Sequence, residues 1–341
     1  MKAIIYVKYG PLDSLQLKEV EKPTPKDNEV LVKIYATTVT PGDVIIVKGE
    51  PFPVRFWSGL LGPKHKIPGK EMAGRVEAVG INVTQFQPGD EVFGDLSVCG
   101  LGAFAEYVSV PEDAIARKPA NLTFEEAAAV PESAVVALQG LRDKGKIQPG
   151  QKALINGTSG GVGSFAVQIA KSFGAEVTAV CSTRNLDMAR SLGADHVIDY
   201  TQEDFTQNGK QYDLILAANG YHPISDYRRA LSPEGAYVAT GGSMAQTFEA
   251  MLQGPIISMR GSKKMSNMLV KPNKDDLIFV KDLIEAGKVV PTIDRSYPLS
   301  EFAEAFQYLE EGHAQGKVVI MVHQAEPDQS LHLPITIPAL S

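Results

Sequence analysis

The stretch Gly157-Thr158-Ser159-Gly160-Gly161-Val162-Gly163 decides the fold of this chain. It follows a short apolar run, Lys152–Asn156, which is predicted as a strand, and it opens residues 162–173, which are predicted as a helix. A glycine-rich turn in that place lets backbone N–H groups and the positive end of the helix approach a phosphate with no side chain in the way. In the G-x-G-x-x-G frame the first position is Thr158, so one glycine of the pattern is missing. The alternative is a tight turn that binds nothing.

Strands and helices continue to alternate beyond this turn. Strands are predicted at Glu176–Cys181, 196–200, Tyr212–Ala217 and 236–240, and helices at 186–192 and 224–231. This rhythm is typical of a parallel sheet covered by helices. The α/β region begins near Thr123, which is suited to cap a helix that has Glu125 and Glu126 in its first turn.

The N-terminal region is rich in short strands. Strands are predicted at 30–35, 75–79 and 105–110, with glycine and proline between them. Many short strands that are separated by glycine and proline predict a compact, barrel-like domain. Beyond about residue 265, helices are predicted at 274–286 and 300–311, and a closing strand at 317–323.

Composition limits the classes of function. The chain has 341 residues, 44% of them hydrophobic, and a formal net charge of −7. The length is typical of about two domains, and the absence of any basic run argues against nucleic acid as the main partner. Neither a signal peptide nor an apolar stretch of ~20 residues is found, which predicts a cytoplasmic protein without a membrane span. The two cysteines, Cys99 and Cys181, are too few for a four-cysteine zinc site and are typical of a reducing compartment.

The residues after the strand Glu176–Cys181 indicate which dinucleotide the turn would hold. An NAD-binding unit places Asp or Glu there for the ribose 2′-hydroxyl, whereas Ser182-Thr183-Arg184-Asn185 contains no acid. Ser182 and Asn185 offer hydrogen bonds, and the Arg184 guanidinium suits a 2′-phosphate. NADPH is therefore predicted, unless Arg184 is only a solvated residue at the start of a helix. Tyr200 is predicted as a second phosphate contact or, alternatively, as a packing aromatic.

Five stretches resemble the medium-chain dehydrogenase/reductase superfamily, specifically its zinc-free NADPH:quinone oxidoreductase branch. They are Gly69-Lys70-Glu71-Met72-Ala73-Gly74, Gln87-Pro88-Gly89-Asp90-Glu91-Val92, residues 158–163, residues 192–200, and Gly316-Lys317-Val318-Val319. The resemblance covers residues 1–323, and the five stretches together are highly specific.

The resemblance implies an α/β fold in which a Rossmann doubly wound parallel sheet is joined to a GroES-like, β-rich catalytic domain. Residues 1–122 would form the N-terminal part of the catalytic domain, 123–265 the NADPH-binding Rossmann domain, and 266–325 the return to the catalytic domain. The active site is expected in the cleft between the domains, and a homo-oligomer is implied. Residues 326–341 are predicted as a disordered tail, although the apolar alternation at 333–337 could instead add a strand to a neighbouring chain.

The predicted cofactor contacts combine the glycine turn, the strand ends and the closing strand. They are Thr158, Ser159, Gly160, Gly161, Val162, Ser182, Arg184, Asn185, Tyr200, Asn219, Gly241, Gly242 and Lys317.

Two positions depart from the zinc-dependent members of the superfamily. Those relatives hold zinc with a Cys in the early segment and a His in the G-H-E segment, and Thr40 and Lys70 stand at these places here. A hydroxyl and an ammonium cannot replace thiolate and imidazole as zinc ligands. No metal site is predicted, so nothing remains to polarise an alkoxide.

Without a metal, the substrate must already be electrophilic. The predicted partner is a quinone or an α,β-unsaturated carbonyl that accepts hydride from NADPH. Charge that develops on the acceptor oxygen still needs a donor, and the predicted catalytic groups are Thr40 and Lys70. The structural alternatives are an ion pair of Lys70 with Glu71 or Asp43 and a hydrogen bond from Thr40 to local backbone. Residues 49–66 are predicted to rim the substrate cleft or to pack on their own domain.

Two other functions stay open at this point. An enoyl-thioester reductase of the same superfamily would act on fatty acyl chains. An NADPH-binding sensor or structural protein would bind the cofactor with little catalysis. Turnover of quinones, enones and enoyl thioesters separates the three.

Overall fold

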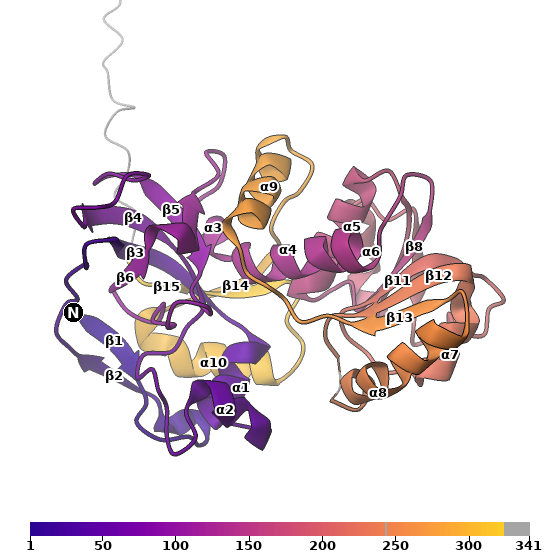
Figure 1. Cartoon of the computed structure of the whole chain (residues 1–341), viewed down its shortest axis with the longest axis horizontal. Coiled ribbons are helices and arrows are strands. Elements are labelled where there is room, and N and C mark those ends of the chain that lie inside the picture. The colour runs from indigo at the N-terminus through magenta and orange to yellow at the C-terminus, as the bar shows by residue number, and fades with distance from the viewer. Residues whose placement is uncertain (243, 324–341) are drawn as a thin grey trace, which may run out of the picture.

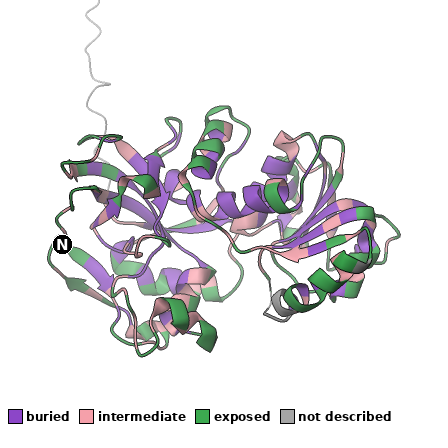
Figure 2. Cartoon of the chain, in the orientation of Figure 1, coloured by how far each residue is buried: buried purple, intermediate pink, exposed green. Residues whose placement is uncertain are grey.

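Two large sheets form the core of the protein (Figure 1). The computed structural model describes residues 1–242 and 244–323, so the predicted tail at 326–341 and the alternation at 333–337 lie outside the described residues. The central strands of both sheets are mostly buried, and the outer faces of the helices are exposed (Figure 2). Over the described ranges, no helix is both long and apolar enough to cross a membrane.

The first sheet has six parallel strands in the order β10-β9-β8-β11-β12-β13. They are β8 (Lys152–Asn156), β9 (Glu176–Cys181), β10 (His196–Asp199), β11 (Tyr212–Ala217), β12 (Leu231–Ala239) and β13 (Lys264–Asn267). Helices cover both faces: α5 (Gly161–Ser172) and α6 (Leu186–Ser191) lie on one, and α7 (Ile224–Ala230) and α8 (Met244–Arg260) on the other (Figure 1). The chain starts at the middle of the sheet and leaves in both directions, which is the predicted doubly wound arrangement.

The strand that leads into the glycine turn is buried on both faces. Ala153 and Ile155 belong to the core under α5, whereas Leu154 belongs to the core under α7 and α8. A strand covered on both faces needs apolar side chains at every position rather than at alternate ones. The run KALIN therefore reads as a strand even though it has no period of two.

The second sheet is mostly antiparallel and has seven strands. The order is β14-β15-β3-β4-β5-β7, with β6 also paired to β3, and β1 and β2 form a separate pair. The strands are β1 (Lys2–Ile5), β2 (Gln16–Glu19), β3 (Glu29–Val39), β4 (Glu71–Val79), β5 (Glu91–Asp95), β6 (Tyr107–Pro111), β7 (Ile115–Arg117), β14 (Ile293–Pro298) and β15 (Lys317–Met321). The helices of this part are α1 (Pro41–Lys48), α2 (Arg55–Ser58), α3 (Phe124–Ala128) and α10 (Phe302–Glu310). Strand β15 pairs with β3, so the end of the described chain completes the sheet that its beginning started.

Most predicted elements are confirmed, but among the described residues the helices α1, α2, α4 and α8 and the short strands β1, β2, β7, β13 and β14 were not predicted. Helix α8 contains Pro255, which weakens a helical prediction. Helix α4 (Pro131–Leu138) is buried throughout and so shows no amphipathic period, and α1 is short. The boundaries at 122/123 and 265/266 remain predictions, and β13 runs across the second one. Helix α9 (Lys274–Glu285) agrees with its predicted range to within one residue.

A buried carboxylate joins the two halves of the molecule. Glu71, the first residue of β4, is fully buried and pairs with the Lys317 ammonium at the start of β15. It also accepts a hydrogen bond from the Thr38 hydroxyl on β3 and, at 2.7 Å, from the backbone N–H of Glu132 in α4. One side chain therefore fixes the start of α4 against three neighbouring strands of the second sheet, β15, β3 and β4. The stem of Lys317 in turn lies against Gly161 of the glycine turn.

Candidate active site

The glycine turn adopts a conformation that side chains would block. Gly157 has φ +86°, and a Cβ there would lie 2.6 Å from the backbone N of Asn219. A Cβ on Gly163 would collide with the carbonyl oxygen of Gly157, because the first turn of α5 lies directly on the end of β8. The glycines are therefore required for the strand and the helix to meet this closely.

The start of α5 is open to an anion. Gly160 is the N-cap, and neither a side-chain cap nor an acidic residue is present in the first turn. The N–H groups of that turn have no partner within the helix, and they carry the positive end of its dipole. These features fit a pyrophosphate group.

A crevice of about 940 Å³ lies beside this turn at the carboxyl ends of the parallel strands. Seven of the predicted cofactor contacts line it: Ser159, Gly160, Ser182, Arg184, Asn185, Tyr200 and Asn219. They come from three different strand ends and the glycine turn, so the fold has brought together residues that are up to 60 positions apart in the sequence. The volume suits a dinucleotide.

Six predicted contacts do not line this crevice. Thr158 is fully buried, and its hydroxyl donates to the carbonyl of Ile155 at 3.0 Å. Lys317 is turned to Glu71 and supports the turn from behind. The remaining four are Gly161, Val162, Gly241 and Gly242, in the first turn of α5 and in the loop after β12.

Several lining residues were not among the predicted cofactor contacts. Asn156, Gly157, Thr183, Glu203, Asp204, Phe205, Gly220, Tyr221, His222, Gly312, His313 and Ala314 also border the crevice. Residues 312–314 come from the return to the catalytic domain, and no local pattern marks them. They matter for Arg184, because its guanidinium donates to the carbonyl of His313 at 2.8 Å and is thereby held at the crevice. This contact uses one of the five N–H groups of the guanidinium.

An acid lies beside Thr183 in space, although none follows β9 in the sequence. Asp199 ends the neighbouring strand β10 and accepts a hydrogen bond from the Thr183 hydroxyl at 2.5 Å. That hydrogen bond, with others from Thr201, lowers the pKa of Asp199. Asp199 is not among the residues that line the crevice.

Lys70 and Thr40 meet in a second cluster, at the start of α4. The Lys70 ammonium is buried and pairs with the carboxylate of Glu132. Thr40 caps α1, and its hydroxyl donates to the Asp43 carboxylate at 2.7 Å. The ion pair proposed from sequence as a structural alternative thus exists, but with Glu132 rather than with Glu71 or Asp43 as the direct partner. The residue after Glu132, Ser133, lies against Gly161 and so places this cluster next to the glycine turn.

The charges of this cluster are fixed by burial and by one another. Burial lowers the pKa of Lys70, but Glu132 and Asp43 outweigh it, so the pKa lies above its usual value and the ammonium stays charged. Burial raises the pKa of Glu132, but Lys70 and Lys317 outweigh it, so the net pKa is lowered. Burial raises the pKa of Asp43 and of Asp95 to about 6. The cluster therefore holds the positive charge of Lys70 among carboxyl groups, two of which have a pKa of about 6.

The donor set of this cluster does not suit zinc. An ammonium at position 70 carries a positive charge and has no lone pair to give. In the part of the chain that the structure describes, no group of three or more His, Cys, Asp or Glu side chains is placed to hold a metal ion. No chemical step is assigned to a metal here.

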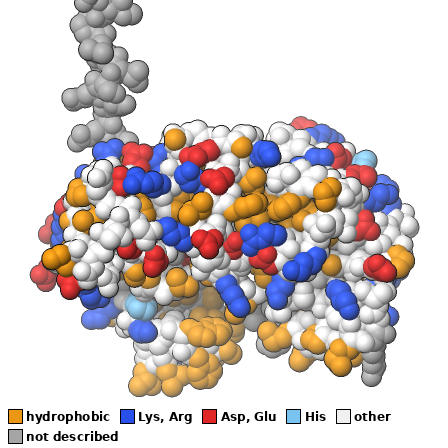
Figure 3. Space-filling model, turned by 45° about the horizontal axis from the view of Figure 1, so that its top comes forward, with side chains coloured by type: hydrophobic (Ala, Val, Ile, Leu, Met, Phe, Trp, Pro, Cys, Tyr) orange, Lys and Arg blue, Asp and Glu red, His pale blue; other side chains and the backbone are white. Residues whose placement is uncertain are grey.

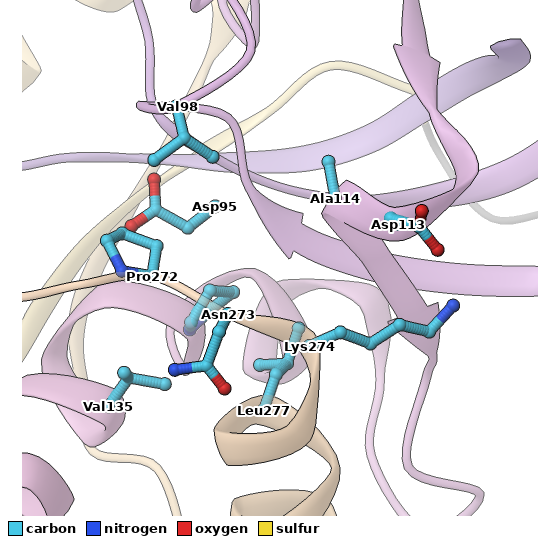
Figure 4. Close-up of a pocket in the computed structure, with 10 residues that line it drawn as sticks. Asp95, Val98, Asp113, Ala114, Val135, Pro272, Asn273, Lys274 and Leu277 are labelled. Carbon is cyan, nitrogen blue, oxygen red and sulfur yellow. The ribbon is translucent and has the colours of Figure 1, made fainter.

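A second, much smaller cavity is lined in part by Asp95. It has a volume of about 30 Å³ and lies between β5 and α9, bordered by Val98, Pro272 and Asn273 (Figure 4). A cavity of that size holds a water molecule but neither a dinucleotide nor a quinone. Residues 49–66, which were predicted to rim the cleft, border neither this cavity nor the large crevice.

Comparisons with known proteins agree with this architecture. The alcohol dehydrogenase GroES-like domain family matches residues 26–120, and a zinc-binding dehydrogenase family matches residues 192–320. The chloroplast envelope quinone oxidoreductase homolog of Arabidopsis thaliana is 36% identical over 94% of this chain and 98% of its own length. The NADPH-dependent alkenal/one oxidoreductase, chloroplastic, of the same plant is 34% identical over 94% of this chain and 79% of its own length. The solved quinone oxidoreductase from Coxiella burnetii has a TM-score of 0.83 and 28% identity, and covers 95% of this chain and 99% of that one.

The chain belongs to the medium-chain dehydrogenase/reductase superfamily, in its quinone oxidoreductase-like branch. It is an oxidoreductase that uses a nicotinamide cofactor, NADH or NADPH. The α/β fold with a Rossmann sheet and a GroES-like domain, predicted from the sequence, is confirmed.

The buried Asp43 carboxyl makes stability depend on pH. Its pKa is about 6 in the folded protein and ~3.9 in the unfolded chain, so the folded state binds more protons between these values. Stability should therefore fall as pH rises from about 4 to about 6. Asp43→Asn removes this titration, so the variant should gain up to about 3 kcal/mol relative to the unmutated protein across that window.

Urea unfolding at a series of pH values between about 4 and 7 measures this difference. Asp13→Asn, at an exposed position, is the control for the substitution itself. Asp95 is present in both proteins, so its contribution to the pH dependence cancels when the two are compared. A difference between Asp43→Asn and the unmutated protein that is the same at every pH would show that Asp43 does not titrate in this way.

Proposed function

We propose that this protein transfers a hydride from NADPH to a quinone or an α,β-unsaturated carbonyl without the help of a metal. The observation that carries the proposal is the Lys70–Glu132 ion pair, which lies next to the glycine turn at a place where zinc-dependent relatives would need a metal ligand. A site with a fixed ammonium at the place of a metal ligand suits an acceptor that is already electrophilic.

Different residues of the crevice would bind different parts of the dinucleotide. The first-turn N–H groups of α5 and the Ser159–Gly160 backbone would hold the pyrophosphate. Arg184, held by His313, would contact the 2′-phosphate, with Ser182 and Tyr200 beside it. When bound, NADPH supplies the hydride, and the protein supplies orientation and a site from which water is excluded.

Lys70 is proposed to stabilise charge on the acceptor oxygen. Its ammonium is charged and fixed in place by Glu132, so it needs no reorganisation as negative charge develops. Thr40 is less suited to that role in this structure, because its hydroxyl already donates to Asp43. We therefore propose Lys70 as the catalytic residue and Thr40 as a positioning residue that holds Asp43.

The names of similar proteins support a quinone or an α,β-unsaturated carbonyl as the hydride acceptor. One similar protein is called a quinone oxidoreductase homolog, and another an NADPH-dependent alkenal/one oxidoreductase. A solved structure with a TM-score of 0.82 and 26% identity is an enoyl reductase, which keeps enoyl thioesters as the second candidate class. A panel of quinones, enones and enoyl thioesters with NADPH oxidation as the readout decides between them.

The proposal extends to the assembly and the location of the protein. Strand β13 is the edge of the parallel sheet, and α8 beside it exposes Met251, Leu252, Ile256 and Met259. An open edge flanked by apolar side chains supports a homo-oligomer. We propose a cytoplasmic location, although relatives carry chloroplastic and mitochondrial names.

Replacing Lys70 tests the proposed catalytic role. Lys70→Met should lower kcat/KM for a quinone by about 10²–10³-fold, because the acceptor oxygen loses its positive partner. Lys70→Arg keeps the charge and should retain more activity. The Kd for NADPH should stay within about threefold of the unmutated value in both variants, which controls for a collapsed fold. Full kcat/KM in Lys70→Met would remove Lys70 from the mechanism.

Replacing Arg184 tests the choice of cofactor. Arg184→Ala should weaken NADPH binding by roughly 10–100-fold, because a charge-assisted hydrogen bond to the 2′-phosphate is lost. NADH binding should change little, so the ratio of the affinities for NADPH and NADH should fall. Arg190→Ala is the matched control, since Arg190 pairs with Asp187 on the outside of α6. Titrations that give equal affinities for NADPH and NADH in the unmutated protein would contradict this role of Arg184.

A further inference from the structure

An exposed apolar segment lies on the catalytic domain, away from the crevice. We call residues 51–62 the aromatic loop; it contains α2 and the only tryptophan of the chain. Five of its large apolar side chains are more than half exposed: Phe52 57%, Phe56 67%, Trp57 74%, Leu60 53% and Leu61 101%. Apolar side chains gather at the lower edge of the catalytic domain in Figure 3, where α1 and α2 lie in Figure 1. Single exposed apolar residues are ordinary, but a cluster of this kind marks an interaction surface.

The backbone beneath these side chains is held firmly. The Tyr9 hydroxyl lies 2.7 Å from the Ser58 hydroxyl and donates to the carbonyl of Gly59 at 2.6 Å. Arg55 donates to the carbonyl of Gly49 at 3.0 Å, and its guanidinium lies 4.7 Å from the centre of the Tyr9 ring. The polar groups of the loop thus bond inward while its apolar side chains point outward. The exposure is a property of the fold and not of a loose end.

The segment that carries the aromatic loop is basic, in contrast to the whole protein. The chain carries a formal net charge of −7, yet residues 48–66 contain four basic residues and one acidic residue. Lys64 and Lys66 are exposed just past the loop. Lys8 is exposed on the N-terminal segment, which lies beside them because the Tyr6 N–H donates to the carbonyl of Lys66. Val7, on the same segment, is 71% exposed and extends the apolar surface.

We propose that the aromatic loop docks this protein on the surface of an anionic lipid bilayer. Tryptophan, phenylalanine and leucine insert at the boundary between headgroups and acyl chains, and lysines at the rim bind anionic headgroups. A second copy of this chain fits the surface less well. A two-fold dimer through the loop would set the basic rim of one copy against that of the other.

The position of the loop has a consequence for the reaction. Helix α1 begins beside Thr40 in the Lys70 cluster and ends at Lys48, directly before the loop. Its eight residues span about 12 Å. A docked molecule would thus hold the Lys70 cluster close to lipid-dissolved acceptors. This consequence rests on the proposed function, whereas the docking itself does not.

Trp57 is a built-in probe for docking. The full chain is titrated with vesicles of phosphatidylcholine containing about 30% phosphatidylglycerol, and with vesicles of phosphatidylcholine alone. The Trp57 emission should shift to shorter wavelength and be quenched by brominated acyl chains with the anionic vesicles, and binding should weaken as salt is raised. No shift, or an equal shift with both vesicles at all salt concentrations, overturns the proposal. A shift that follows protein concentration without lipid indicates a second copy and overturns it as well.

Variants that keep Trp57 separate the apolar and the charged contributions. Phe56→Ser with Leu61→Ser should weaken vesicle binding at least about tenfold, because two inserted side chains are lost. Lys64→Glu with Lys66→Glu should do the same on anionic vesicles. The matched controls replace equally exposed residues elsewhere: Ile81→Ser with Leu269→Ser, and Lys210→Glu with Lys288→Glu.

All these positions are exposed, so folding should be preserved, and NADPH binding verifies it. Because the readout is binding and not turnover, failure of docking and failure of the proposed reaction give different results. Controls that lose as much vesicle binding as the loop variants would show that no defined surface is involved.

Discussion

The Glu71 carboxylate is the constraint on which the rest of the site depends. It is fully buried, and it receives the Lys317 ammonium, the Thr38 hydroxyl and the Glu132 backbone N–H. A buried carboxylate with these partners is stable, whereas the same group without them would carry a large desolvation cost. Three segments that are far apart in the sequence must therefore meet at one point. That point sets the start of α4 and the position of the glycine turn beside it.

Two functional elements are aligned by this junction. On one side, Lys317 and Ser133 lie against Gly161 and fix the open end of α5 beside the crevice. On the other side, Glu132 pairs with Lys70 and fixes an ammonium in the second cluster. A hydride donor on the first side and an acceptor on the second would be held in contact by the same few side chains. Positioning and a fixed charge are the means by which such a site accelerates a reaction.

The parts of this site that local sequence could predict are those set by local geometry. The glycine turn, strand β9 and Arg184 after it follow from short patterns, and the crevice beside the turn agrees with them. The partner of Lys70 did not follow, because Glu132 is 62 residues away and α4 has no amphipathic period. Asp199 and residues 312–314 were missed for the same reason, since only the sheet order brings Asp199 to Thr183 and only the returning chain brings His313 to Arg184.

Transfer of a labelled hydride tests the central claim most directly. Chelator-treated protein, shown by elemental analysis to hold no zinc, is given an enone and NADPH deuterated at the transferred position of the nicotinamide ring. We predict that mass spectrometry finds one deuterium at the β-carbon of the reduced product, at a rate that added zinc does not raise. Unlabelled product, or turnover that appears only when zinc is restored, would contradict the account.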